Sequence, residues 1–206
     1  LGDGSIRGTG GERPLDYRVS VGTKLTNITG MMVEVIPDLA FNGGPGLSKD
    51  GNMVITEIET KWQGAEEGAK EMPITFVDAK ASFTQKDFDV KRTFDGNLDG
   101  GNRGWALGVG DYKVPHRAVY KVKDVIAGDP EKGVNLSVGI LCRFKSHPLG
   151  RFRIYITSDP DPLQFGLPSH VVEAVEKDDA NRNQSDRDSL RDWVAEGDAD
   201  YQSKLW

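Results

Sequence analysis

The sequence predicts an all-β protein built as an antiparallel β-sandwich. Short segments alternate apolar with polar residues or form compact apolar runs, and clusters of turn formers separate them. The chain has 25 glycines and 10 prolines among 206 residues, which favours many short strands over long helices. Because no helical periodicity lies between the expected strands, antiparallel connections are favoured over βαβ units.

The expected strands all precede residue 160. Alternation is clearest at 17–21 and 32–36, where one face of each strand is expected to lie on a core. The full set of expected strands is 17–21, 32–36, 53–60, 74–83, 116–125, 134–144 and 150–157. Arg151 and Arg153 alternate with apolar residues in the last of these, so both are expected on the face away from the core, in an interface or an ion pair.

The pattern changes after the segment Asp159-Pro-Asp-Pro162, which cannot continue a strand ladder. Helical spacing of apolar residues predicts short helices at 170–177 and 185–195, with Ser185 as the N-cap of the second. The predicted organisation is therefore a sandwich domain at 1–160 and an acidic helical tail at 161–206, which acts as a tail or as a linker to a following domain.

Charge and composition exclude several classes of function. The formal net charge is -6, most of it in the tail, and the sandwich carries no basic stripe that would indicate a nucleic-acid partner. No apolar run is long enough to predict a membrane span. The single Cys142 lies in an apolar run and is expected to be a buried small hydrophobe. The chain opens with Leu1 and no Met, as expected of a segment excised from a longer protein.

The loop at 92–105 is the most informative motif. Asp95 and Asp99 offer carboxylates, Asn97 and Asn102 offer amide oxygens, and the glycines between them allow positive φ. Hard oxygen ligands on such a loop suit calcium, although the spacing is not that of an EF-hand. A metal-free turn closed by side-chain hydrogen bonds is the alternative.

Several motifs together resemble the galactose-binding-like module of planctomycete multi-domain proteins that also carry cytochrome c-like domains. The motifs are Phe94-Asp-Gly-Asn97, Gly104-Trp-Ala106, Val114-Pro-His116 and Leu149-Gly-Arg-Phe-Arg-Ile154. The first two are shared with the wider discoidin class of β-sandwich. The resemblance implies a jelly roll, circularly permuted because Thr56-Glu-Ile-Glu59 precedes the Asp95 loop. It also implies a periplasmic or extracellular location and neighbouring domains as partners.

The resemblance further implies a structural calcium bound by this loop and by the strand that carries Glu57. Asp95 and Glu57 would supply side-chain oxygens, and Arg92, Asn97 and Thr56 would supply backbone carbonyls. Such a set suits calcium better than magnesium, which keeps its waters. The chain departs from the family pattern at Arg103, where the family usually has Thr.

Sugar-binding sandwiches commonly place a flat aromatic ring against a pyranose and fix its hydroxyls with polar side chains. The candidates for binding a polysaccharide or glycan cluster near the loop: Asn102, Trp105, Tyr112, His116 and Arg117. Tyr112 is expected to be exposed. The alternatives are that Trp105 is a core anchor and that His116 is a hydrogen-bonding strut.

No motif in the sequence marks a catalytic site. The nucleophile elbow, the phosphate-binding loop and the zinc-ligand spacings are all missing. Glu57 and Glu59, roughly 7 Å apart on one strand face, imitate the acid pair of an inverting glycosidase. The sequence therefore favours a non-catalytic carbohydrate-binding module with a structural calcium, part of an exported bacterial protein. The alternatives are a structural or protein-docking domain and, less favoured, a glycoside hydrolase.

Overall fold

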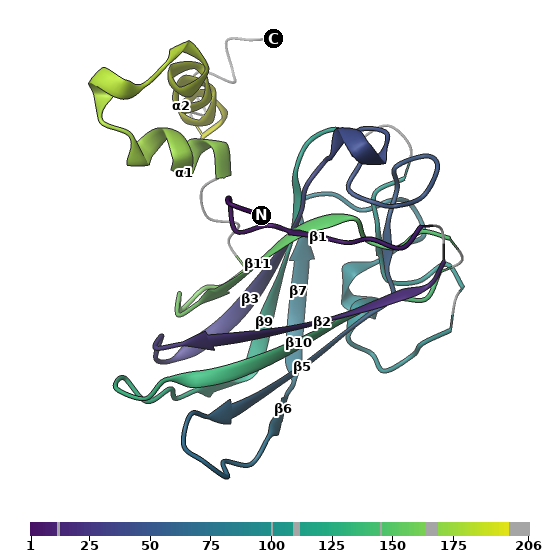
Figure 1. Cartoon of the computed structure of the whole chain (residues 1–206), viewed down its shortest axis with the longest axis vertical. Coiled ribbons are helices and arrows are strands. Elements are labelled where there is room, and N and C mark those ends of the chain that lie inside the picture. Colours follow the sequence, from purple (N-terminus) through teal and green to yellow (C-terminus); the bar gives the residue numbers. More distant parts are fainter. Residues whose placement is uncertain (12, 100, 109–111, 145, 164–168, 198–206) are drawn as a thin grey trace. The chain divides into compact units, whose positions relative to one another are not determined.

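The computed structural model describes residues 1–11, 13–99, 101–108, 112–144, 146–163 and 169–197. The chain divides into two compact units, Leu1–Gln164 and Phe165–Trp206 (Figure 1). The division falls close to the change of pattern expected at residue 160.

In its described part, the first unit consists of strands joined by turns and two 3-10 helices. Their bounds are β1 Ile6–Arg7, β2 Leu15–Thr23, β3 Ile28–Val35, η1 Leu39–Phe41, β4 Val54–Ile55, β5 Glu57–Gly64, β6 Met72–Ile74, β7 Phe76–Ala81, η2 Val90–Thr93, β8 Trp105–Ala106, β9 His116–Ile126, β10 Val134–Cys142 and β11 Arg151–Thr157. The expected all-β class is confirmed.

The strands form two main antiparallel sheets. A five-stranded sheet has the order β1-β11-β3-β9-β7, and a four-stranded sheet has the order β2-β10-β5-β6 (Figure 1). The short pair β4-β8 forms a third sheet. Apolar side chains from both main sheets meet in one core, among them Val33 and Tyr120 from the first and Val138 and Ile140 from the second. This is a β-sandwich.

The alternation in the sequence sets which face of each strand is buried. In β2 the residues alternate between half-buried and exposed along its whole length. In β10, Val138 and Ile140 have no exposed surface and face the core, so the alternate positions Ser137 and Gly139 face away from it. Strand β10 pairs with β2 on one side and with β5 on the other in an unbroken register.

Two expected strands each divide into two. The segment 74–83 splits at Thr75: β6 joins the four-stranded sheet, whereas β7 joins the five-stranded sheet. The segment 53–60 splits at Thr56, whose N–H donates to the Leu141 carbonyl and whose hydroxyl accepts the Arg143 N–H. The two-residue period of core-facing residues continues through Thr75, from Ile74 to Phe76, whereas at Thr56 it shifts by one residue, since Ile55 and Ile58 both lie in the core.

Trp105 anchors the C-terminal end of the Asp95 loop in the core. Its side chain has no exposed surface, and its indole N–H donates to the Phe83 carbonyl at 2.9 Å. The preceding Gly104 has φ +82°, and a Cβ there would lie 2.1 Å from the Ile55 carbonyl oxygen. Only glycine permits both this conformation and this approach. The loop is thereby held against the β4–β5 junction.

The second unit contains the helices α1 Ser169–Glu176 and α2 Gln184–Gly197, with the 3-10 turn η3 Asp179–Asn181 between them. Ser185 was expected to cap α2, and this is wrong. The Asn183 side chain accepts the Asp186 N–H at 2.9 Å, and the Asp186 carboxylate accepts the Asn183 N–H at 2.9 Å. This reciprocal pair is a capping box, in which Asn183 is the N-cap. Ser185 lies inside the helix, two residues after the cap. No described helix is long and apolar enough to cross a membrane.

Candidate functional site

The Asp95 loop lies against the strand that carries Glu57, as expected from the permuted order. The Gly96 N–H donates to Glu57 Oε1 at 3.1 Å. Glu57 is 4% exposed, and its Oε2 is buried with no hydrogen-bond partner. The juxtaposition of Asp95 with Glu57, which lie 38 residues apart in sequence, is therefore a property of the fold.

Side chains within the loop close its turns. Asp95 Oδ1 accepts the Asn97 N–H at 3.0 Å, and Asn97 Oδ1 accepts the Asp99 N–H at 2.9 Å. Gly96 has positive φ, like Gly104. Asp95 Oδ2 accepts a hydrogen bond from the Arg103 guanidinium, so the two ends of the loop are joined by an ion pair. These are the contacts expected of a turn closed by its own side chains. Gly100 lies outside the described residues.

The surroundings of Glu57 change its acidity. Burial raises the pKa of Glu57 to about 7. The hydrogen bond from Gly96 opposes this shift, the negative charges of Asp95 and Glu59 add to it, and the positive charge of Arg103 lowers the pKa. Near neutral pH the carboxyl group therefore exists in both protonation states.

The structure brings Asp95, Asn97 and Glu57 together through Gly96. The roles expected of the Thr56 and Arg92 carbonyls stay predictions. Thr56 is buried at the β4–β5 junction, where its hydroxyl accepts the Arg143 N–H, and Arg92 lies on η2 with its N–H bonded to the Asp89 carbonyl. Within the described residues, no group of three or more His, Cys, Asp or Glu side chains is arranged to hold a metal.

The expected sugar-binding residues do not form an open face. Trp105, His116 and Arg117 are buried, which supports the core-anchor alternative for Trp105. The His116 ring contacts the Ser82 hydroxyl at 3.3 Å, as expected of a strut. Tyr112 was expected to be exposed, but it is half-buried and packs against the core. Of the five candidates, Asn102 is exposed. His116 lies on the inward face of β9, whereas Arg117 is buried on the outer face, where it pairs with Glu34.

A groove that sequence reasoning missed lies on the outer face of the four-stranded sheet. Its volume is about 410 Å³, and Gly139 lies at its floor. Arg18 and Glu59 are directly opposite Gly139 on the flanking strands β2 and β5. Leu98, from the Asp95 loop, forms one wall. The loop and the groove are therefore parts of one site.

The groove continues along the sheet into a second hollow of about 320 Å³. The register places three outward rows side by side, and we call them the polar face: Arg18, Gly139 and Glu59; Ser20, Ser137 and Lys61; Gly22, Asn135 and Gln63. Successive rows lie roughly 7 Å apart. The rows carry hydroxyl, amide and charged side chains, while Tyr17 contributes to the lining of the first hollow and Trp62 to that of the second. The signal in the sequence is the recurrence of small polar residues at every second position of β2 and β10.

Charges at the edges of the polar face are paired. Arg143 forms an ion pair with Asp16, and Lys61 forms one with Glu71 at 2.7 Å. The Arg18 guanidinium lies 3.4 Å from the Ser137 hydroxyl. The surface is thus polar without a strong charge of either sign.

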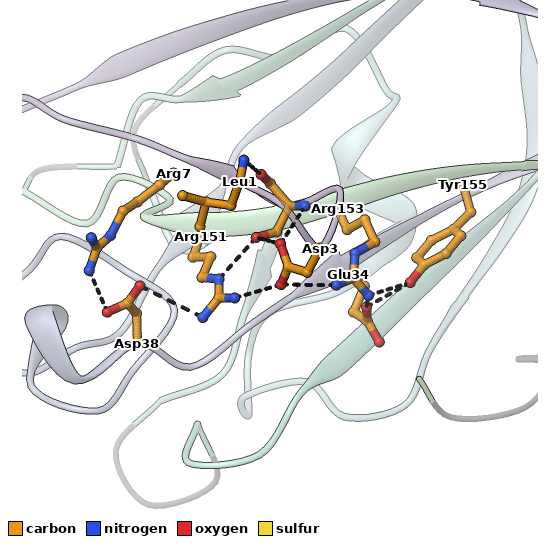
Figure 2. A network of polar contacts seen from close by, with 9 residues as sticks. Leu1, Asp3, Arg7, Glu34, Asp38, Arg151, Arg153 and Tyr155 are labelled. Carbon is orange, nitrogen blue, oxygen red and sulfur yellow. Dashed lines mark hydrogen bonds and ion pairs between the residues drawn. The ribbon is translucent and has the colours of Figure 1, made fainter. Parts of the chain in front are cut away.

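A second polar cluster covers the outer face of the five-stranded sheet (Figure 2). Glu34 on β3 is 1% exposed and lies between Arg117 on β9 and Arg153 on β11, at 3.0 and 3.1 Å. Arg151 and Arg153 both reach Asp3, which confirms the expected ion-pair role of these two arginines. The Ser5 side chain and the arginine charge hold the pKa of Asp3 well below its usual range. The cluster fixes the N-terminal segment on the sheet.

Cys142 is not a candidate nucleophile. Its side chain is buried, and burial raises the pKa of the thiol to about 12. Only a minute fraction is thiolate at neutral pH. The expectation of a buried small hydrophobe is confirmed.

A scan against protein-family models, a search of curated proteins and a search of solved structures each found no match.

Proposed function

We propose that the chain is a non-catalytic carbohydrate-binding module that takes a neutral glycan along the polar face. The observation that carries the proposal is Gly139, a buried glycine at the floor of the groove in the inner strand β10. Glycine in a strand interior costs about 0.5–1 kcal/mol relative to alanine. Such a position often marks a bulge or a place where a ligand comes close to the backbone.

No bulge accounts for Gly139. The pairing of β10 with both neighbours is continuous through this residue. A Cβ there would lie 3.3 Å from the Glu59 carbonyl oxygen, a tight contact that requires the backbone of β5 to move by a few tenths of an ångström. Gly22 is similar, because its nearest neighbour would be the flexible Asn135 side chain at 3.2 Å. Internal packing therefore does not require glycine at Gly22 and disfavours a side chain at Gly139 only through one backbone contact, and a ligand that rests on the sheet supplies a reason for both glycines.

The chemistry of the polar face suits a sugar chain. Hydroxyl, amide, guanidinium and carboxylate groups all exchange hydrogen bonds with sugar hydroxyls. The ion pairs at the edges leave little net charge, which disfavours a strongly acidic polymer. Because the rows themselves are polar and the nearby Tyr17 and Trp62 rings are half-buried, we expect weak binding, on the order of 0.1 to 1 mM, or about 4 to 5.5 kcal/mol.

The buried position of Glu57 argues for binding without catalysis. A glycosidase needs one protonated and one ionised carboxyl group within reach of the glycosidic bond. The raised pKa of Glu57 fits the first role. At 4% exposed, however, with Gly96 over Oε1, Glu57 has no access for a substrate.

The test is a screen of soluble polysaccharides and oligosaccharides at millimolar concentration, followed by calorimetry on any glycan that binds. Gly139→Val should fill the floor of the groove and weaken binding at least roughly tenfold while the protein stays folded. Lys123→Ala, at an exposed site on β9, is the matched control and should leave the affinity unchanged.

Two outcomes would contradict the proposal. If the glycan binds Gly139→Val as well as it binds the wild type, the sugar lies elsewhere. If no glycan binds, the structural or protein-docking alternative is favoured. Hydrolysis of the bound glycan would instead indicate an enzyme.

A further inference from the structure

The Asp95 loop already contains a cation of its own. Arg103 pairs with Asp95 across the loop, and its side chain is only 21% exposed. Two buried atoms at this site have no hydrogen-bond partner, Arg103 Nε and Glu57 Oε2. The positive charge of Arg103 is also near enough to Glu57 to act on that carboxyl group. The Arg103 guanidinium thus forms an ion pair with Asp95 and also lowers the pKa of Glu57 through its charge.

A calcium ion fits this arrangement poorly. Calcium takes six to eight oxygen ligands, of which carboxylates are the strongest. Asp95 Oδ1 is used by the Asn97 N–H and Oδ2 by Arg103. An ion bound to Asp95 would place two further positive charges beside the guanidinium, at a separation where Coulomb repulsion is strong. Calcium at Asp95 would therefore compete with the Asp95–Arg103 pair.

We propose that the Arg103 guanidinium is the resident cation of the Asp95 loop and takes the place of the calcium implied by the resemblance. Two features of the loop support its independence from metal. Its turns are closed by Asp95 and Asn97, and its C-terminal end is fixed by Gly104 and Trp105. Arg103 supplies the remaining requirement, a positive charge that neutralises Asp95.

The experiment compares thermal unfolding of the full chain in chelator and in millimolar calcium, for the wild type, Arg103→Gln and Arg103→Lys. The wild type should show the same Tm in both conditions and no calorimetric signal with calcium. Arg103→Gln removes the charge and should lower Tm in chelator by about 2–4 °C. Arg103→Lys keeps a cation and should lose less.

Calcium has a second use in this experiment. In Arg103→Gln, Asp95 Oδ2 loses its guanidinium partner and the buried Glu57 Oε2 still has no hydrogen-bond partner, so both can bind a cation. If calcium raises the Tm of this variant and not that of the wild type, the result supports the proposal that Arg103 takes the place of calcium. A wild-type Tm that falls in chelator, or calcium binding to the wild type, would overturn the proposal. So would an Arg103→Gln variant as stable as the wild type in chelator. If Arg103→Gln fails to fold, the calcium titration of the wild type and of Arg103→Lys still decides the question.

Discussion

Glu57 shows how the fold changes the chemistry of a single residue. Its position on β5 would ordinarily point the side chain to solvent, since Glu59, two residues on, is exposed. The Asp95 loop covers Glu57, removes it from water and raises its pKa to about 7. An acid in this position stabilises the folded state only while it holds its proton.

A pH dependence follows from the raised pKa. The ordinary value is 4.5 and the folded value is about 7, so the unfolded chain releases the proton first as the pH rises. The free energy of unfolding should therefore fall between about pH 4.5 and 7, by on the order of 3 kcal/mol. Glu57→Gln mimics the protonated form and should remove this fall. Chemical denaturation of both proteins from pH 4 to 8 measures the difference, and parallel curves would show that Glu57 does not titrate as inferred.

Glu34, by contrast, is a buried acid that forms ion pairs with Arg117 and Arg153. Removing it should take one buried carboxylate partner from Arg117 and from Arg153, whose contact with Asp3 remains. We expect Glu34→Ala to cost about 3–5 kcal/mol of unfolding free energy, measured by urea denaturation. The control replaces all three residues at once with Leu or Met, which should cost far less because no charge is left unpaired. A loss below about 1 kcal/mol in the single variant would show that the cluster is not strongly coupled.

At the scale of elements, alternation predicted where strands lie better than it predicted where they end. The expected strands at 17–21, 32–36, 116–125, 134–144 and 150–157 coincide with β2, β3, β9, β10 and β11. The segment that divides at Thr75 keeps the two-residue period through the break, whereas the segment that divides at Thr56 shifts by one residue there. A strand that changes sheets does so because its hydrogen-bond partners change, and those partners are distant in sequence.

The cap of α2 gives a prediction at the same scale. Asn183→Ala removes one side of the capping box and should destabilise α2 by about 1 kcal/mol. Hydrogen exchange of the α2 amides should then quicken about fivefold, since local opening becomes easier. Ser185→Ala is the matched control and should leave exchange unchanged. Equal effects of the two variants would restore Ser185 as the cap.

At the scale of the whole molecule, the two units should be separable. The last strand of the sandwich ends at Thr157, but the residues after it, Asp159 and Pro162, still contact this unit. The Thr29 hydroxyl donates to the Asp159 carbonyl at 2.5 Å. Pro162 packs against Gly30 so closely that a Cβ added to Gly30 would lie 2.5 Å from the Pro162 Cβ. A domain cut at residue 160 would remove this cover.

We therefore expect a chain that ends after Gln164 to fold, with the circular dichroism and cooperative thermal transition of a β-protein. A chain that ends after Asp159 should fold with a lower Tm, because Gly30 and its neighbours lose the apolar contact of Pro162. A molten or insoluble product from the longer chain would show that residues 165–206 contribute to the core of the sandwich.

The sequence by itself determined the all-β class, the inward and outward faces of the main strands, the outward arginines of β11, the burial of Cys142 and the helical character of the tail. These are local properties, because a two-residue period and the identity of a side chain fix them wherever the strand is placed. It also indicated that the Asp95 loop would lie on the Glu57 strand.

Only the tertiary structure decided which partners the polar residues contact and how far each is buried. The pairing of Arg103 with Asp95, the raised pKa of Glu57 and the groove floor between Arg18 and Glu59 all depend on strand register and on which loop covers which face. The same holds for Tyr112 and His116, which a turn-rich sequence made appear accessible and the sandwich buries. Charge interactions and burial depend on neighbours that are distant along the chain, so they are settled when the two sheets close on each other.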